Sequence, residues 1–232
     1  MGIIVNGCAI FLGGILGNGL KRYVKWSNVS VLGIGIMLIS CFGMLENMLT
    51  VTSRGLESQS LIIVVLALFI GSFIGEKLRL EKRVQRVGRG ERGTALSAFL
   101  TGSVFFGIGG LQLSGAIALA LNADSSQLFF KSIVDFPFAL TFGAAYGLGI
   151  SASCIPVMLM QLLIALLAYV ARPLFSAEAV RQICAIGYII LFFTGFNLAG
   201  SGKYKVNTIN MIPAILLIVG YQAAICIVEG IR

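Results

Sequence analysis

The sequence predicts an all-α polytopic membrane protein, with about 7–8 transmembrane helices in one bundle. Three observations predict this class: the mean hydropathy is +0.98, only 11% of the 232 residues are charged, and several stretches of about 18 or more residues carry no charge, which is long enough to cross a bilayer. Soluble domains are about a quarter charged. Because no polar segment is long enough to fold separately, residues 1–232 are expected to form a single transmembrane domain.

The first three apolar segments are expected to cross the membrane in alternating directions. They cover Gly2–Leu20, a run within Trp26–Leu45, and Ser58–Gly75. The segment 76–92 follows, with seven basic and three acidic residues. Loops rich in Lys and Arg stay in the cytoplasm, so this basic segment is predicted to be cytoplasmic and the N-terminus to lie outside.

The charge-free run Gly93–Ala123 allows two interpretations. It forms one long tilted helix, or it breaks near Gly107–Gly110 into a re-entrant pair, with Gly107, Gly109 and Gly110 as hinge or packing residues. Glycine weakens a helix by about 1 kcal/mol relative to alanine. Charge bias fits both, because the 17 basic residues divide 12 inside to 5 outside in the first case and 14 to 3 in the second. The continuous span is favoured, since most such runs are simple helices.

Four further apolar segments are expected to be helices. The first lies within Gln127–Ser153 and ends in a turn supplied by its glycines and serines. The others cover Ala152–Ala171, Gln182–Gly200 and about Val206–Val228.

The most informative polar residues lie in Lys131–Asp135. Lys131 and Asp135 are four residues apart and share a helix face. A lone carboxylate near the bilayer centre costs about 2.5–3.5 kcal/mol, which pairing with Lys131 and donors from Ser132 would partly offset. Pro137 is predicted to be a hinge or packing residue like those glycines. It lacks an N–H, so the carbonyl of Ile133 loses its helical partner and can join the carboxylate in a cation or water site. The alternative is an interfacial salt bridge at a helix start, where proline is tolerated.

Uncharged polar residues inside spans form a second group of candidates, which includes Asn6 and Gln161. Taken singly, each is most simply an interhelical hydrogen bond, worth about 0.6 kcal/mol. However, Ile4–Gly14 can be aligned with Ile133–Gly143, a weak match that pairs Asn6 with Asp135. In transporters built from repeats, such residues lie near the interface of the halves. Asn6 and Asp135 are therefore predicted to line a solute or ion pathway, together with Lys131, Ser132, Ile133 and Gln161.

Several other functions are disfavoured by what the sequence lacks. It has no histidine, and its five cysteines lie in apolar runs without a CxxC pair. We therefore expect no catalytic triad, no metal site, no cofactor and no enzymatic activity. The basic residues lie at the ends of apolar runs, which indicates contact with lipid headgroups and not with nucleic acid. Pairs of glycines in GxxxG spacing are compatible with a homo-oligomer.

Four motifs resemble a known bacterial family, the inner-membrane proteins of domain of unknown function 554. They are the opening pattern of Gly2, Asn6, Ile10, Gly13 and Gly14, the basic segment after the third span, the glycine-rich Gly102–Gly115, and KSIVD at Lys131–Asp135. In the family a glycine usually follows this aspartate, whereas here Phe136 and Pro137 follow. The resemblance implies a multi-span helical protein of the bacterial inner membrane with an unproven transport role, and it supplies no substrate or site residues.

Two functions follow from these observations. The first is a passive or ion-coupled transporter or channel for a small solute or ion, with a polar intramembrane site around Asp135. The alternative is a membrane interaction or scaffold protein that binds lipid or a partner through the basic segment 76–92.

Overall fold

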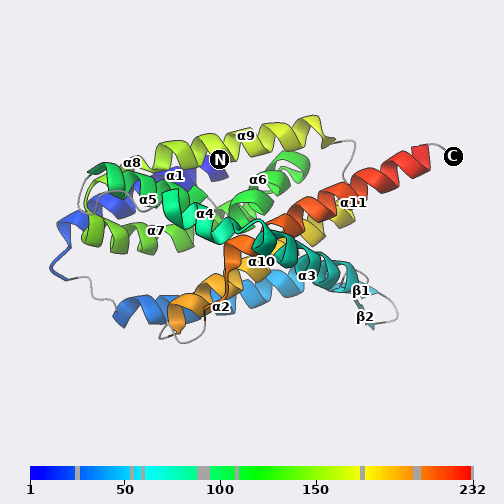
Figure 1. The fold of residues 1–232 in the computed structure, drawn as a ribbon, viewed down its shortest axis with the longest axis horizontal. Coiled ribbons are helices and arrows are strands. Elements are labelled where there is room, and N and C mark those ends of the chain that lie inside the picture. Colours follow the sequence, from blue (N-terminus) through cyan, green and yellow to red (C-terminus); the bar gives the residue numbers. More distant parts are fainter. Residues whose placement is uncertain are drawn as a thin grey trace.

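The computed structural model describes residues 1–23, 27–52, 55–58, 61–87, 95–107, 110–172, 176–200 and 205–230. This part of the chain is almost entirely helical, which confirms the predicted all-α class (Figure 1). Its helices are α1 (Gly2–Gly19), α2 (Ser27–Met48), α3 (Leu61–Lys77), α4 (Leu80–Val87), α5 (Ala95–Gly107), α6 (Gly110–Asn122), α7 (Ser126–Tyr146), α8 (Gly149–Ala152), α9 (Cys154–Val170), α10 (Ala177–Ala199), the short 3-10 helix η2 (Thr208–Met211) and α11 (Pro213–Gly230). A small antiparallel hairpin of β1 (Thr50–Thr52) and β2 (Gly55–Glu57) joins α2 to α3.

The described helices fit a multi-pass membrane protein. Five spans are long and apolar enough to cross a bilayer: α1, α7, α8 with α9, α10, and η2 with α11. The pair α5 and α6 makes a sixth. Residues Gly33–Met48 of α2 form a shorter apolar helix, and α3 has 17 residues. The predicted 7–8 spans are therefore an approximate count.

Helices α1 and α7 pack against each other in parallel. Near their starts, a Cβ added to Gly2 would lie 2.8 Å from the Cβ of Leu128. Towards their ends, a Cβ on Gly17 would overlap the backbone oxygen of Leu140. Because residues further along α1 contact residues further along α7, the two helices run in the same direction (Figure 1).

Helix α5 runs opposite to α1. It is parallel to α9, since Gly102 faces Ser153 at one end and Gly107 faces Val157 further along. Helices α9 and α1 are antiparallel, because Asn6 near the start of α1 contacts Gln161, whereas Gly14 further along α1 contacts Ser151, which precedes α9. Helix α5 therefore points against α1 and α7.

Helix α6 continues in the direction of α5. It is linked to the N-terminus of α7 by residues 123–125, and Ser114 and Gly115 near its middle contact Gln127 and Leu128 at the start of α7. It therefore also runs against α7. The two helices are bent by 58° at the break between Gly107 and Gly110, and their common direction against α7 favours one broken span over a re-entrant pair. The described residues form two helices here and not the favoured single continuous helix. Ile108 and Gly109 lie outside the described residues.

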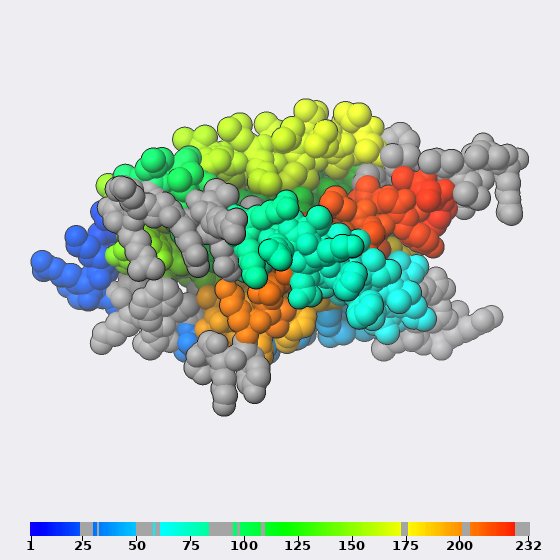
Figure 2. Space-filling model, in the orientation of Figure 1, coloured from blue at the N-terminus to red at the C-terminus, as the bar shows by residue number. Residues whose placement is uncertain are grey.

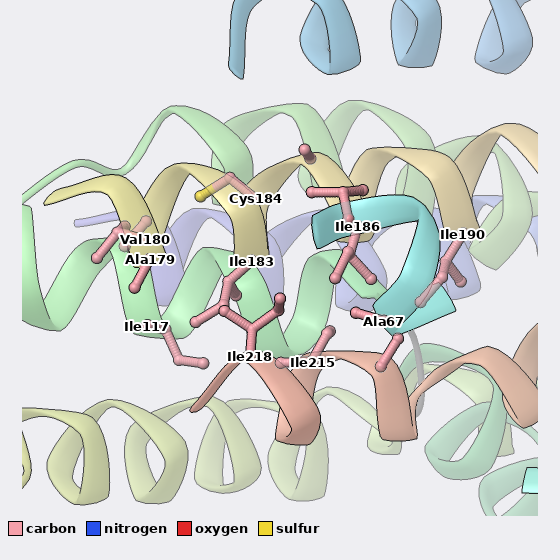
Figure 3. Close-up of a cluster of buried hydrophobic side chains, with 14 of the residues drawn as sticks. Ala67, Ile117, Ala179, Val180, Ile183, Cys184, Ile186, Ile190, Ile215 and Ile218 are labelled. Atoms are coloured by element: carbon pink, nitrogen blue, oxygen red, sulfur yellow. The ribbon is translucent and has the colours of Figure 1, made fainter. Parts of the chain in front are cut away.

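Two apolar clusters hold the bundle together. One surrounds α10, where Ile183, Ile186 and Ile190 meet Ile215 and Ile218 of α11 (Figure 3). The other joins residues of α1, α2 and of α5 to α10. These clusters place α10 between α2 on one side and α6 on the other.

The glycine pairs that suggested self-association are used inside the chain. Gly17 packs on α7, and Gly71 packs on Ala214 of α11. Gly75 lies against the backbone of Asn210 in η2. A small residue lets two helix backbones approach closely, so these pairs build the fold of a single chain.

Helix α4 lies across the polypeptide that connects α10 to α11. In Figure 2 the blue-green atoms of this region adjoin the orange atoms of η2 on the visible face. The backbone N–H of Glu81 donates to Oδ1 of Asn210 at 3.0 Å, and Oε2 of Glu81 accepts from the N–H of Ile209 at 3.3 Å. This contact lies at one end of the space between α5, α7 and α10.

Candidate functional site

A cavity of about 680 Å³ lies among α5, α6, α7 and α10. Most of its wall is apolar and aromatic, including Phe105, Phe138 and Leu191. One end is bounded by α4 and η2, and the break between α5 and α6 lies beside it, because Gly110, Leu111 and Gln112 belong to the wall. Irregular backbone inside a membrane protein is tolerated where it lines such a space.

The ion pair of Lys131 and Asp135 lies in the wall of this cavity. The ammonium nitrogen Nζ of Lys131 is 2.5 Å from Oδ2 of Asp135. Both residues are buried, with exposed fractions of 6% and 5%, and Asp135 lies midway along α7. An interfacial salt bridge at the start of a helix does not describe this position. Buried charges in a membrane are costly and are typical of functional sites.

A chain of amide side chains continues from the carboxylate across the bundle. Asn6 on α1 donates from Nδ2 to Oδ2 of Asp135 at 2.8 Å. Gln161 on α9 donates from Nε2 to Oδ1 of Asn6 at 3.0 Å and to Oε1 of Gln112 at 2.9 Å. Gln112 on α6 in turn donates to the backbone oxygen of Val157 at 3.1 Å. The network therefore ties four helices to one carboxylate.

Some polar groups of this network have no hydrogen-bond partner among the described residues. Oε1 of Gln161 is fully buried without one. Oδ1 of Asp135 makes none of the hydrogen bonds found there, because both bonds to this carboxylate end on Oδ2. Lys131 has three N–H donors, and only one is used within the described part of the chain. Since Lys131 and Asp135 both line the cavity, Oδ1 of Asp135 and the other two N–H groups of Lys131 are placed to meet a ligand or water.

The other end of the cavity holds a second pair of opposite charges. Nζ of Lys205 is 3.9 Å from Oε1 of Glu81, and both residues line the cavity. The adjoining segment is held to α10 because Asn197 exchanges two hydrogen bonds with the backbone of Val206, at 2.7 and 2.8 Å. This end is therefore polar, whereas the walls between the two charged pairs are mostly apolar.

The structure places the remaining predicted site residues at varied distances from the cavity. Ser132 is buried and donates to the backbone oxygen of Leu128 in its own helix. The side chain of Ile133 is 62% exposed on the outer surface of α7, away from the cavity wall. Pro137 lies inside α7, which continues through it. A role for the Ile133 carbonyl stays a prediction.

The predicted hinge glycines differ in their surroundings. At Gly110 an added Cβ would lie 2.8 Å from the backbone oxygen of Gly187, so close packing with α10 requires glycine there. At Gly107 the nearest atom to such a Cβ would be the sulfur of Met160 at 3.5 Å, which is an ordinary contact. Gly109 lies outside the described residues.

Sequence reasoning missed Gln112 and Asn210 as parts of the site. Gln112 was visible as a polar residue in an apolar run beside the glycine-rich break. Asn210 precedes Pro213 at the start of the last span, and only its contact with Glu81, 129 positions away, shows its importance. Among the described residues, no cluster of His, Cys, Asp or Glu is suited to hold a metal ion.

Comparison with known proteins gives relatives over nearly the whole length. A family model described as "Protein of unknown function (DUF554)" matches residues 1–223. The chain is 29% identical over 245 residues to "Uncharacterized protein YqgA" of Escherichia coli (strain K12), with 97% of each chain covered. It is 24% identical over 219 residues to "Uncharacterized membrane protein YdfK" of Bacillus subtilis (strain 168), with 93% of each covered. No solved structure matches it.

Proposed function

We propose that this chain, which belongs to the DUF554 family of proteins of unknown function, is a passive or ion-coupled transporter or channel for a small solute. The family assignment confirms the resemblance seen in the sequence, and a multi-pass membrane protein is what its apolar helices and its relative YdfK support. The family carries no substrate, so the proposal comes from the site.

One observation carries the proposal: a cavity of about 680 Å³ leads to a buried ion pair midway along a membrane-spanning helix. A dry, packed core would argue for a purely structural ion pair. When an ion pair lies on a cavity wall, each of its two charged groups can instead bind a ligand in place of the other group. The break between α5 and α6 lies beside the same cavity. The discontinuous helices of transporters are likewise interrupted at their binding sites.

The cavity is an inward-facing vestibule in this proposal. The basic segment 76–92 is cytoplasmic by its charge, and α4 within it bounds the mouth. On the opposite side of the ion pair the bundle is packed, with Leu128, Ile117 and Leu121 buried and Ser114 hydrogen-bonded to Gln127 at 2.6 Å. The protein then resides in the bacterial inner membrane, with its N-terminus outside.

Flux measured in proteoliposomes tests this function. Purified protein is reconstituted, and uptake of a panel of small solutes and ions is compared with that of vesicles that carry Asp135→Asn. We expect flux in the native protein and its loss in the variant, and thermal unfolding shows whether the variant, which leaves the Lys131 ammonium without its counter-ion, is still folded. Full flux in a folded Asp135→Asn protein would sink the proposed role of the carboxylate.

A second candidate function is favoured by the outer face of α4. Lys82 and Arg83 are exposed, while the neighbouring Glu81 is buried against η2. Exposed cations beside a membrane bind anionic headgroups or acidic partners. Neutralising both should release such a partner without changing flux, whereas a transporter that needs no docking would show no change in binding.

A further inference from the structure

The charged groups that line the cavity are balanced in number. Among the described residues its wall contains two acidic side chains, Glu81 and Asp135, and two basic ones, Lys131 and Lys205. They occur as two pairs, one at the mouth and one at the inner end. Where charged side chains select an ion, they carry an excess of the opposite charge: Asp and Glu for cations, Arg and Lys for anions. This lining carries no such excess.

Both members of the inner pair, Lys131 and Asp135, have hydrogen-bonding positions that the described residues do not use. Oδ1 of Asp135 accepts no hydrogen bond from the described residues, and Lys131 uses one of its three N–H groups there. The two charged groups are 2.5 Å apart. A ligand that places an ammonium against Oδ1 and a carboxylate against Nζ would therefore meet both at once.

The wall beyond the pair is suited to an apolar group. Phe105, Phe138, Leu191 and Val104 face the same space. The volume of about 680 Å³ lies in the range of small-molecule sites, about 300–1,000 Å³. A ligand with two opposite charges at one end and an apolar body at the other fits the arrangement.

We propose that the cavity binds a zwitterionic solute of the α-amino acid class, with an apolar side chain. This inference rests on the proposed function and names its substrate class. The ammonium of the solute pairs with Asp135, its carboxylate pairs with Lys131, and its side chain lies against the aromatic wall. Four alternating charges then keep the site neutral.

Charge balance is the physical reason for this choice. A bare cation would displace Lys131 from Asp135 and leave an unpaired ammonium in a mostly apolar cavity, and an anion would leave an unpaired carboxylate. Leaving one member of a buried pair without a partner is strongly unfavourable. A zwitterion compensates both charges, so the ion pair can open without net charge being buried.

Calorimetric titration of the purified full-length protein in nanodiscs tests the inference. The probes are phenylalanine, N-acetylphenylalanine, which is an anion, phenylalanine methyl ester, which is a cation, and potassium chloride. We expect saturable binding of phenylalanine and an affinity at least about tenfold weaker for each blocked derivative. Equal or tighter binding of either derivative, or of potassium, overturns the inference.

Variants of the protein test separately what the charged pair and what the apolar wall contribute to binding. Asp135→Asn and Lys131→Gln should each weaken phenylalanine binding by about tenfold or more. Because either substitution can also disturb folding, Val104→Phe provides a second test: it keeps both charges and fills part of the cavity, so it should weaken phenylalanine more than alanine. An equal loss of affinity for phenylalanine and alanine would contradict the proposal that the ligand's side chain lies against this wall. Glu178→Gln, in the half-buried ion pair with Arg181 on α10, is the matched control, because neither residue lines the cavity; it should leave phenylalanine binding unchanged.

Two different results would show whether the substrate class alone is wrong or whether the protein is not a transporter. If reconstituted protein carries an inorganic ion or an uncharged solute through Asp135 and binds no amino acid, transport stands and the substrate class is wrong. If no solute crosses and no probe binds, both are wrong.

Discussion

The side-chain amide of Asn6 donates a hydrogen bond of 2.8 Å to Oδ2 of Asp135, although 129 positions separate the two residues. The same offset pairs Gly14 with Gly143, and these glycines are also in contact. Residues that the weak internal match equates therefore meet across the interface of α1 and α7. Parallel packing of the two helices makes this possible, because equivalent positions then lie at the same depth.

Loss of Lys131 alone should destabilise the protein more than loss of the whole pair. Lys131→Met leaves a buried carboxylate without its counter-ion, which typically costs about 3–5 kcal/mol. The double variant Lys131→Met, Asp135→Leu removes both charges and should recover much of that loss. Thermal or denaturant unfolding in detergent measures this. A double variant less stable than Lys131→Met would show that Asp135 stabilises the fold even without its counter-ion, through the hydrogen bond that it accepts from Asn6.

Asn6→Ala should lower stability by about 1.5–3 kcal/mol, since a buried hydrogen bond to a charged group is lost. It also removes the acceptor of Gln161. Asn18→Ala, on the same helix at a half-buried position, is the control and should be close to neutral. Unfolding midpoints of the two variants provide the comparison. Equal shifts would mean that the amide of Asn6 has no special part in holding Asp135.

Gly17→Ala should weaken the contact between α1 and α7. The added Cβ would overlap the backbone oxygen of Leu140, and a backbone atom cannot move aside cheaply. Gly35→Ala is the matched control, because nothing lies within 4 Å of a Cβ there, and alanine should stabilise that helix by up to about 1 kcal/mol. Opposite shifts in the unfolding midpoint are expected. If Gly17→Ala is stabilising, the close parallel packing is incorrect.

Residues before and after the broken span should be reached from opposite sides of the membrane. In a protein freed of its native cysteines, Lys82→Cys and Asp124→Cys both place a thiol at an exposed position. An impermeant maleimide added outside cells should label Asp124→Cys and leave Lys82→Cys unlabelled until the membrane is opened. Labelling of both positions from one side would instead indicate a re-entrant pair.

Much of the architecture could be predicted from the sequence. Long uncharged runs separated by basic clusters are sufficient to identify a multi-pass helical membrane protein, because the bilayer requires every backbone group to be bonded within its own helix. Lys131 and Asp135 stood out for the same reason, since charges within an apolar run demand an explanation. Their closeness on one helix follows from their spacing alone.

The rest depended on packing between distant segments. Hydropathy could not decide whether Gly93–Ala123 is continuous, because glycines are tolerated both in a straight helix and at a break. The break became evident from the 58° bend between α5 and α6. Gln112, Asn197 and Asn210 have no distinguishing local pattern, and their partners are 9 to 129 positions away. The sequence by itself therefore determined the membrane class, the charged pair and the basic segment. Only the tertiary structure decided which polar residues meet and that a cavity reaches them, because these depend on how helix surfaces fit together in three dimensions.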